Sequence, residues 1–499
     1  MSAVDLINPV MLKELRQTVR NRSVLGAVIA FLGLELVVSW IVLGIVAGEQ
    51  AGAGAMFATQ TNGNTLFGWI AALLYVVIGF VLPLSTMTRL SMERRKDFVD
   101  MQFSTLLGPA DFVDGKAASA LVVSLSFFSA ALPFLLLSFL LRGVDILRIL
   151  YVSGWILAIS CVGDYFAVFC GSLPASPLLR RGLFVICWGS VAWGGVGLGV
   201  FDNFIDEVLR VPSTHEGWLA AGFCLAVSVT AVVFFRQFAI RAMTSPNHER
   251  DRTLRLVFSA AILAWGVGLF LVALADNEYG WIAAWMWLVA VGTVFFMAAG
   301  ASGLADFPRR VLLEAPRNAA RRVARVMLAS GGEGGVLFPL LVALPAWGAV
   351  RWAIPVFDHL RLASDAPRLY AHCVAASVIV GYAASYIIVL RSLWLYFLRG
   401  RIRATFLGVV ALVLFLAVSI ALTVVAESMP ASEVRSEAYS RFGNAFGAFE
   451  ALSHSYSGSG WGIMSAQQYN ALVALAVALA IYTPHIAKMF CRYRRPAGN

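Results

Sequence analysis

Two acidic side chains fall within long apolar stretches of the sequence, Glu35 and Asp164. An ionisable group inside a membrane is costly to bury and usually serves a function. Glu35 has two interpretations: it belongs to a polar patch on a translocation path, or it exchanges protons in an ion-coupled carrier. Asp164 lies near the inner end of its stretch, and the favoured interpretation is that its carboxylate reaches water at the membrane surface.

Motifs for covalent chemistry are absent from the sequence. None of the four lysines ends a G-x-x-x-x-G-K-[ST] phosphate-binding loop. The six histidines are scattered, without H-E-x-x-H, and no paired C-x-x-C accompanies them. Gly163 and Asp164 match part of an intramembrane aspartyl protease motif, but that chemistry needs two carboxylates at one site. We therefore expect no enzyme, metal or cofactor in this chain, and any ATP hydrolysis must come from a separate subunit.

The composition is that of an integral membrane protein. Of 499 residues, 60% are hydrophobic and 13% are charged, whereas soluble domains carry about 25% charged residues. The net charge of +10 is interpreted as a topology signal and an attraction to anionic lipid, not to nucleic acid. Five of the six cysteines fall within apolar stretches and Cys491 lies in the basic tail, so we expect no structural disulfide.

The apolar stretches predict an all-α fold with about twelve transmembrane helices, because a span needs about 20 apolar residues. The candidate spans are residues 25–47, 66–87, 119–141, 149–171, 183–200, 217–235, 256–275, 281–301, 336–356, 371–390, 404–426 and 468–487. Twelve spans put both termini on one side. This topology places 30 of the 38 Lys and Arg residues inside, and the positive-inside rule then predicts N-in and C-in.

A basic amphipathic helix is predicted before the first span, over residues 8–22. Asn8 is a capping residue, and Pro9 suits the first position of a helix. Apolar residues occupy one predicted side: Met11, Leu12, Leu15 and Val19. Polar residues occupy the other: Lys13, Glu14, Arg16, Gln17 and Arg20. The pattern predicts a helix that lies along the inner membrane surface.

The loop over residues 93–116, ERRKDFVDMQFSTLLGPADFVDGK, is the most charged early segment. Its charges cannot rest in hydrocarbon, so it lies outside the bilayer on the cytoplasmic side. Apolar residues at helical spacing predict a short helix that ends at Pro109. A second helix, capped by Asp111, is expected to run through Gly115 and Lys116 into the next span.

This loop resembles the one after the second span of ABC-2 type transporter permeases, roughly E-R-E-R-G-T-L-E-L-L-L-T-T-P-L-S-P-x-E-I-x-x-G-K. The match runs without gaps and covers about one twentieth of the chain. The positions that correspond include Glu93, Arg94, Asp100, Pro109, Asp111, Gly115 and Lys116. Asp97 replaces the usual Gly and Leu106 the first Pro. The segment NPVMLKELRQTVRNR also resembles the elbow helix that precedes the first span in this family.

The resemblance implies a permease subunit of an ATP-driven transporter, generally an exporter, in a bacterial cytoplasmic membrane. A separate cytoplasmic ATPase subunit would dock on the loop 93–116, which would act as the coupling helix. The family usually works as dimers of six-span units, so twelve spans leave two arrangements: one chain that acts as both halves, or a dimer of larger subunits. Because the second six-span region lacks the coupling pattern, a homodimer, or a heteromer with a related permease, is favoured. The alternatives from another class are a secondary carrier driven by an ion gradient, which should show inverted repeats and interrupted helices, and a scaffold without transport.

The chain divides into two six-span regions, 1–244 and 256–499, joined by a polar linker at 245–255. The second region carries no visible copy of the elbow or of the loop 93–116, so it is either an addition or a diverged copy. Its basic inner loop, 303–335, predicts an inner-surface helix that is either a second docking site or a contact for anionic lipid. Its outer loop, 427–467, predicts a helix on the outer face that is either a gate, a partner contact or a connector.

Overall fold

The computed structural model describes fourteen segments of the chain. They are residues 8–20, 22–50, 58–95, 108–141, 144–173, 176–197, 215–244, 251–276, 280–303, 318–328, 332–359, 366–398, 407–427 and 461–492. These segments are helical and contain no strand, which confirms the all-α prediction for the described part. The predicted outer loop 427–467 and the linker 245–255 lie mostly outside the described residues.

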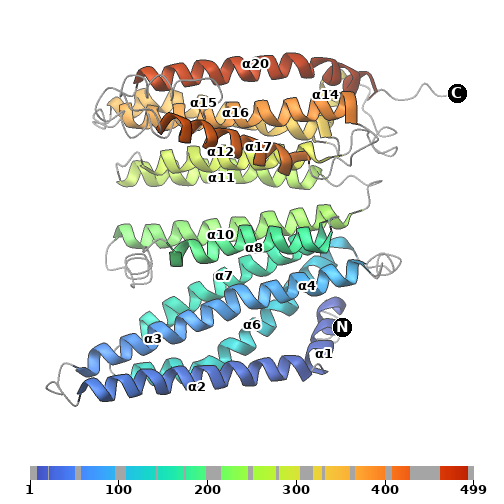
Figure 1. Ribbon diagram of the computed structural model, residues 1–499. Helices are drawn as coiled ribbons and strands as arrows, with labels where there is room; N and C mark the ends of the chain where they lie inside the picture. Colours follow the sequence, from blue (N-terminus) through green and yellow to red (C-terminus); the bar gives the residue numbers. More distant parts are fainter. Residues whose placement is uncertain are drawn as a thin grey trace. The chain divides into compact units, whose positions relative to one another are not determined.

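The chain forms two compact units, Met1–Thr244 and Ser245–Asn499. The first unit contains α1 (Pro9–Arg20), α2 (Arg22–Gln50), α3 (Ala58–Val76), η2 (Val77–Val81), α4 (Leu82–Arg95), α6 (Pro109–Leu140), α7 (Ile146–Ser172), α8 (Pro177–Gly197) and α10 (His215–Met243). The second contains α11 (Arg252–Asp276), α12 (Gly280–Ala301), α14 (Ala319–Leu328), α15 (Gly332–His359), α16 (Ala366–Leu393), η3 (Trp394–Leu398), α17 (Leu407–Glu427) and α20 (Trp461–Arg492). Figure 1 labels most of these helices in chain order.

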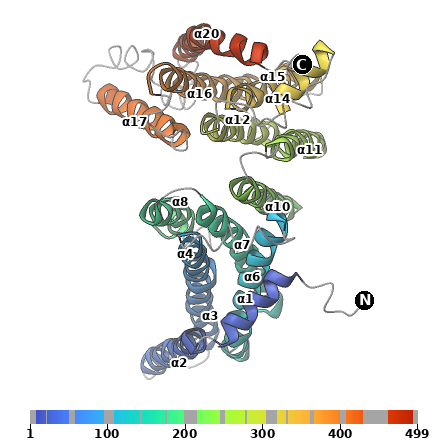
Figure 2. The same ribbon diagram turned by 90° about the vertical axis from the view of Figure 1, so that its right-hand side faces the viewer.

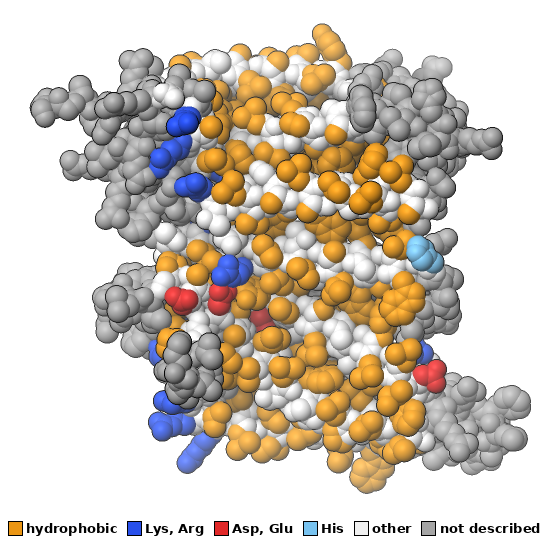
Figure 3. Space-filling model, turned by 180° about the vertical axis from the view of Figure 1, so that it is seen from behind, with side chains coloured by type: hydrophobic (Ala, Val, Ile, Leu, Met, Phe, Trp, Pro, Cys, Tyr) orange, Lys and Arg blue, Asp and Glu red, His pale blue; other side chains and the backbone are white. Residues whose placement is uncertain are grey.

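Every predicted span falls within these helices, apart from a few terminal residues outside the described part. Ten described helical stretches are long and apolar enough to cross a membrane, counting α3 to α4 as one, and α8 and α17 are not among the ten. Apolar side chains cover the flanks of the helices, and most charged side chains lie toward the helix ends (Figure 3). This distribution suits helices that lipid surrounds.

The two units share one packing pattern, although their sequences show no visible repeat. In the first unit the second span (α3 to α4) packs against all the others except α10, and the fourth span (α7) packs against α6, α8 and α10. In the second unit α12 and α16 hold the same two places: α12 packs against all the others except α20, and α16 packs against α15, α17 and α20. Among the described residues, every pair of spans that packs closely in one unit has its counterpart in the other.

A basic amphipathic helix completes each unit in the same place. In the first unit α1 packs against the first and third spans, α2 and α6, and Figure 2 shows it crossing α6. In the second unit α14 packs against the corresponding spans, α11 and α15. The two helices reach this place from different points of the chain, because α1 precedes the first span and α14 follows the second.

The second span of the first unit is interrupted by a π-helical turn, η2. The inserted residue loosens the regular backbone ladder, and the Gly79 carbonyl accepts a hydrogen bond of 2.7 Å from the Trp188 indole N–H on α8. The two halves of the span contact different neighbours. The α3 half packs mainly against α2 and α6, and the α4 half mainly against α7 and α8.

Candidate functional site

The predicted elbow helix forms, and Asn8 caps it as expected. The Asn8 side-chain oxygen accepts a hydrogen bond of 2.9 Å from the Val10 N–H, and its amide donates one of 2.6 Å to the Asp111 carbonyl on α6. One residue therefore starts α1 and fixes it to the beginning of the third span. The predicted faces of this helix are wrong at two residues: Glu14 lies on the buried side with Val10 and Thr18, and Val19 is 84% exposed.

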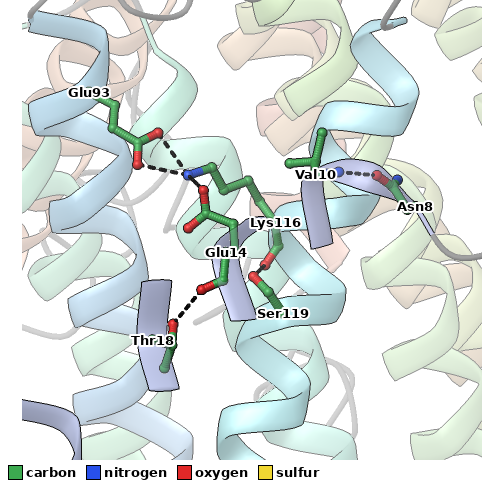
Figure 4. A network of polar contacts seen from close by, with 7 residues as sticks. All are labelled: Asn8, Val10, Glu14, Thr18, Glu93, Lys116 and Ser119. Atoms are coloured by element: carbon green, nitrogen blue, oxygen red, sulfur yellow. Dashed lines mark hydrogen bonds and ion pairs between the residues drawn. The ribbon is translucent and has the colours of Figure 1, made fainter. Parts of the chain in front are cut away.

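Lys116 explains why an acidic residue faces inward. Its Nζ lies 2.6 Å from Glu14 Oε1 on α1, and 2.8 and 2.7 Å from the two carboxylate oxygens of Glu93 at the end of α4. Figure 4 shows the lysine between the two carboxylates. An ammonium group has three donors, so these contacts saturate it. The ion-pair cluster, Glu14–Glu93–Lys116, joins the elbow helix to both ends of the loop 93–116.

Gly115 lets α1 approach α6 closely enough for this cluster to form. A Cβ atom at Gly115 would lie 2.7 Å from Val10 Cβ, 2.9 Å from Asn8 Oδ1 and 3.1 Å from the Met11 backbone nitrogen. No side chain fits there without displacing α1. The adjacent Gly115 and Lys116 therefore have distinct roles, since the glycine permits contact and the lysine fixes it.

The start of α6 differs in detail from the prediction. Gly108, not Asp111, is the N-cap, and Pro109 occupies the first helical position, where its missing N–H costs nothing. Asp111 is the third helical residue, and its carboxylate accepts a hydrogen bond of 3.2 Å from the Gly108 N–H. The helix continues through Gly115 and Lys116 into the span, as expected.

The structure brings together Glu93, Gly115 and Lys116, with Pro109 and Asp111 just before them on α6. Arg94 lies in the last turn of α4, and its side chain lies outside what the structure describes. Asp100 and the rest of the predicted coupling helix, residues 96–107, are also outside the described part. The described residues thus frame the loop from both ends.

A second ion pair links the same end of α6 to the sixth span. The Arg236 guanidinium on α10 contacts the Asp114 carboxylate through two parallel hydrogen bonds of 2.7 and 2.6 Å. Both side chains are about one-third exposed, at 32% and 36%. This bidentate geometry orients both groups. The sequence reasoning missed this pair, since neither residue belongs to a recognised motif.

Glu35, the candidate for the translocation path, is fully buried on α2. It lies one helical turn from Phe31, whose ring centroid is 5.4 Å from that of Phe127 on α6. Neither carboxylate oxygen has a hydrogen-bond partner among the described residues, and the same holds for the Ser39 hydroxyl one turn further. Most of α2 faces outward, so Glu35 is an inward-facing acid on a helix that is mostly exposed.

Asp164 does not reach interfacial water, which corrects the favoured interpretation. Its side chain is 1% exposed, on the helix that packs against the third, fifth and sixth spans. Both of its carboxylate oxygens lack a partner among the described residues. The neighbouring Gly163 lies tightly against Trp188 and Pro83, which would be 2.8 and 3.1 Å from a Cβ atom there.

Buried arginines donate hydrogen bonds to backbone carbonyls at the C-terminal end of the second span in both units. In the first unit Arg180 Nη1 donates to the Ser91 and Gly171 carbonyls, at 3.4 and 3.3 Å. Burial lowers the pKa of Arg180 from its usual value. In the second unit Arg391 Nη1 donates to the Ala301 and Gly303 carbonyls, at 2.7 and 3.1 Å.

Arg391, on α16, also forms an ion pair with a glutamate at the start of α15. Its Nη2 lies 3.6 Å from Glu333 Oε1 at the start of α15, and its guanidinium stacks 4.8 Å from the Trp394 ring centre. The arginine side chain is 0% exposed. The available sequence signal was an arginine just past one predicted span and a glutamate just before another, both on the predicted inner side.

The predicted inner-surface helix of the second unit forms as α14, and Arg255 fixes its end. The Arg255 guanidinium, at the start of α11, donates to the Met327 carbonyl in the last turn of α14. A Cβ atom at Gly334 on α15 would lie 2.7 Å from the Val326 carbonyl, so α14 also contacts α15 closely. Val326 is fully buried, whereas Arg321 and Val323 are exposed.

Among the described residues, no group of three or more His, Cys, Asp or Glu side chains could hold a metal ion. The described polar clusters join helices to one another, which suits the transmission of movement. Fold and surface together define the class: a multi-pass α-helical membrane protein with two units of one packing pattern. No family model, curated protein or solved structure matches the chain.

Proposed function

We propose that the chain is the permease subunit of an ABC-2-like, ATP-driven transporter, and that it exports its substrate. In this proposal it has twelve spans with both termini inside, in a bacterial cytoplasmic membrane. The observation that carries the proposal is the ion-pair cluster Glu14–Glu93–Lys116, which fastens a basic surface helix to both ends of the cytoplasmic loop. This attachment joins α1 to both ends of the loop, which suits a loop that transmits movement to the spans.

The cluster supports a mechanical role. A separate ATPase subunit binds the loop 93–116, with the segment around Asp100 as its contact. Because Lys116 joins the end of α4 to the start of α6, a displacement of the loop moves the second and third spans together. The elbow helix moves with them, since Asn8 and Glu14 attach it to the same point. ATP binds and is hydrolysed in the partner, and no covalent step occurs in this chain.

Glu35 is the residue that we place on the translocation path. It is a buried, inward-facing acid whose carboxylate has no partner among the described residues, so a polar or cationic group of a substrate that reached it would supply the missing partner. Transport at the wild-type rate by a Glu35→Gln variant would remove it from the path.

The experiment for the proposed function is affinity purification of the chain from mild detergent, followed by an assay of ATP hydrolysis and identification of partners. The test variant combines Asp100→Lys with Phe103→Asp in the loop. The control is Asp145→Lys, which makes the same charge reversal as Asp100→Lys at an exposed residue just before α7. We expect full recovery of an ATPase subunit with the native chain and the control, and reduced recovery with the test variant. If the folded native chain brings down no ATPase, the proposal is wrong.

A second candidate function is a carrier driven by an ion gradient. Two buried acids without described partners, Glu35 and Asp164, the repeated packing pattern and the interrupted second span favour it. Repeats and broken helices are features of such carriers. This function leaves the attachment of α1 to the loop unexplained, and it predicts transport by the chain alone in vesicles under a proton gradient.

A further inference from the structure

If the chain is the proposed transporter subunit, the repeated packing pattern indicates how many chains one transporter contains. This inference therefore rests on the proposed function. The two units have the same pairs of packed spans and the same place for an amphipathic helix. Two unrelated six-helix bundles would not be expected to agree in every pair. We infer that the second unit is a complete membrane half, and we propose that one chain supplies both halves, with α14 as the docking element for a second copy of the ATPase subunit.

The position of α14 in the chain supports this role. It lies between the second and third spans of its unit, α12 and α15, and the loop 93–116 lies between the second and third spans of the first unit. The connection that binds the ATPase in the first unit thus has a counterpart that contains a helix. The segment 304–317 of this connection lies outside the described residues.

The attachment of α14 is that of an element that transmits force. Arg255, on the first span of the second unit (α11), donates a hydrogen bond to the Met327 carbonyl of α14. Asp251 lies 3.7 Å from the same guanidinium. Gly334 allows the third span of this unit (α15) to contact α14 closely. Gly300 and Gly335 then place α12 and α15 in backbone contact, since a Cβ atom at Gly300 would overlap the Gly335 carbonyl. A displacement of α14 is therefore transmitted to the first, second and third spans of the second unit, α11, α12 and α15.

The exposed face of α14 favours a protein partner. Arg321 is exposed, and Val323 is 46% exposed on the same short helix, while Val326 anchors it. Residues two apart lie on different sides of a helix, so the exposed basic residue and the exposed apolar residue suit a protein surface that surrounds the helix with an acidic and an apolar region. Contact with anionic lipid headgroups is the competing outcome of the test, because basic amphipathic helices also bind lipid.

The experiment is native mass spectrometry of the complex that the chain forms with the ATPase subunit recovered in the purification above. We expect one chain with two ATPase copies. The variant Arg321→Glu with Val323→Asp should retain one copy, and so should the loop variant Asp100→Lys with Phe103→Asp. The control, Arg16→Glu, reverses an exposed charge on α1 and should keep both copies. Because Arg321 and Val323 are exposed, we expect the α14 variant to elute as the wild type does.

The outcomes separate this inference from the proposed function. Two chains with two ATPase copies would overturn the inference and leave the proposed function intact. An α14 variant that keeps both copies but no longer binds vesicles of anionic lipid would assign the helix to lipid and likewise overturn it. If the native chain recovers no ATPase, both proposals are wrong.

Discussion

Lys116 and Glu14 are 102 residues apart in the sequence, yet their side chains meet at 2.6 Å. Lys116 is 5% exposed and Glu14 is 11% exposed in their side chains. A charge buried to this extent is tolerated only when it is paired. The third span (α6) is therefore stable only when the elbow helix (α1) lies where Glu14 can pair with Lys116.

Replacement of the lysine should reveal this dependence. Lys116→Met leaves two carboxylates without their cation, and we expect the unfolding free energy to fall by about 3 kcal/mol. The measurement is thermal unfolding in detergent, with Arg16→Met on the exposed side of α1 as the control. Glu93→Gln on its own should destabilise less, because Glu93 is 27% exposed. An unchanged midpoint for Lys116→Met would mean that the cluster contributes nothing to the fold.

Gly115→Ala should loosen the elbow helix, because its Cβ would lie 2.7 Å from Val10 Cβ. Overpacking of this kind costs about 1–3 kcal/mol. Thr18 is 9% exposed, and we expect a reagent in water to reach this position about tenfold more often when α1 is loosened by that energy. The measurement is the labelling rate of Thr18→Cys by a water-soluble maleimide, on a cysteine-free background. Gly33→Ala is the matched control, since nothing lies within 4 Å of a Cβ there. Equal rates in both variants would contradict the close approach.

Arg391→Met should destabilise the second unit selectively. The variant removes the donor to the Ala301 and Gly303 carbonyls and the partner of Glu333, and the loss of one member of a buried ion pair costs about 3–5 kcal/mol. Limited proteolysis during heating should cleave the second unit at a lower temperature than the first. Arg391→Lys should recover only part of the loss, because lysine lacks the planar fork of arginine. Simultaneous cleavage of both units would argue against selective destabilisation.

Glu35→Gln should leave the unfolding midpoint unchanged or raise it. The carboxylate has no partner to lose among the described residues, and a neutral amide costs less to bury than a charge. Glu93→Gln serves as the contrast, since it removes the ion pair with Lys116. If Glu35→Gln lowers stability by about 1 kcal/mol or more, the Glu35 carboxylate has a structural partner.

The helices were predictable because their causes are local. Apolar stretches of spanning length predicted the twelve helical segments, and Asn8 with Pro9 predicted the start of α1. The periodicity of arginines and apolar residues around Arg321 likewise predicted a helix. These signals depend on residues within a few turns of one another, so a single sequence contains them.

The partners of the buried charges were not predictable, because they depend on which helices pack together. Glu14 was assigned to the polar face of α1, since a charged residue is ordinarily exposed, and only Lys116 on α6 explains its inward position. Arg391 and Glu333 were each visible as charges at the ends of spans, but their pairing requires α15 beside α16. The repeated packing was hidden for the same reason: it consists of helix contacts, and the side chains that make them differ between the units.

The π-helical turn η2 also sets the direction in which Glu93 points. An added residue rotates everything that follows on the helix by about 100°, so the face that meets α7 beyond Val81 is not the face that meets α6 before Val77. The span therefore tolerates substitutions at this turn better than changes in length. Deletion of one residue there would restore a regular helix and swing the Glu93 carboxylate away from Lys116, without altering any residue that binds the lysine.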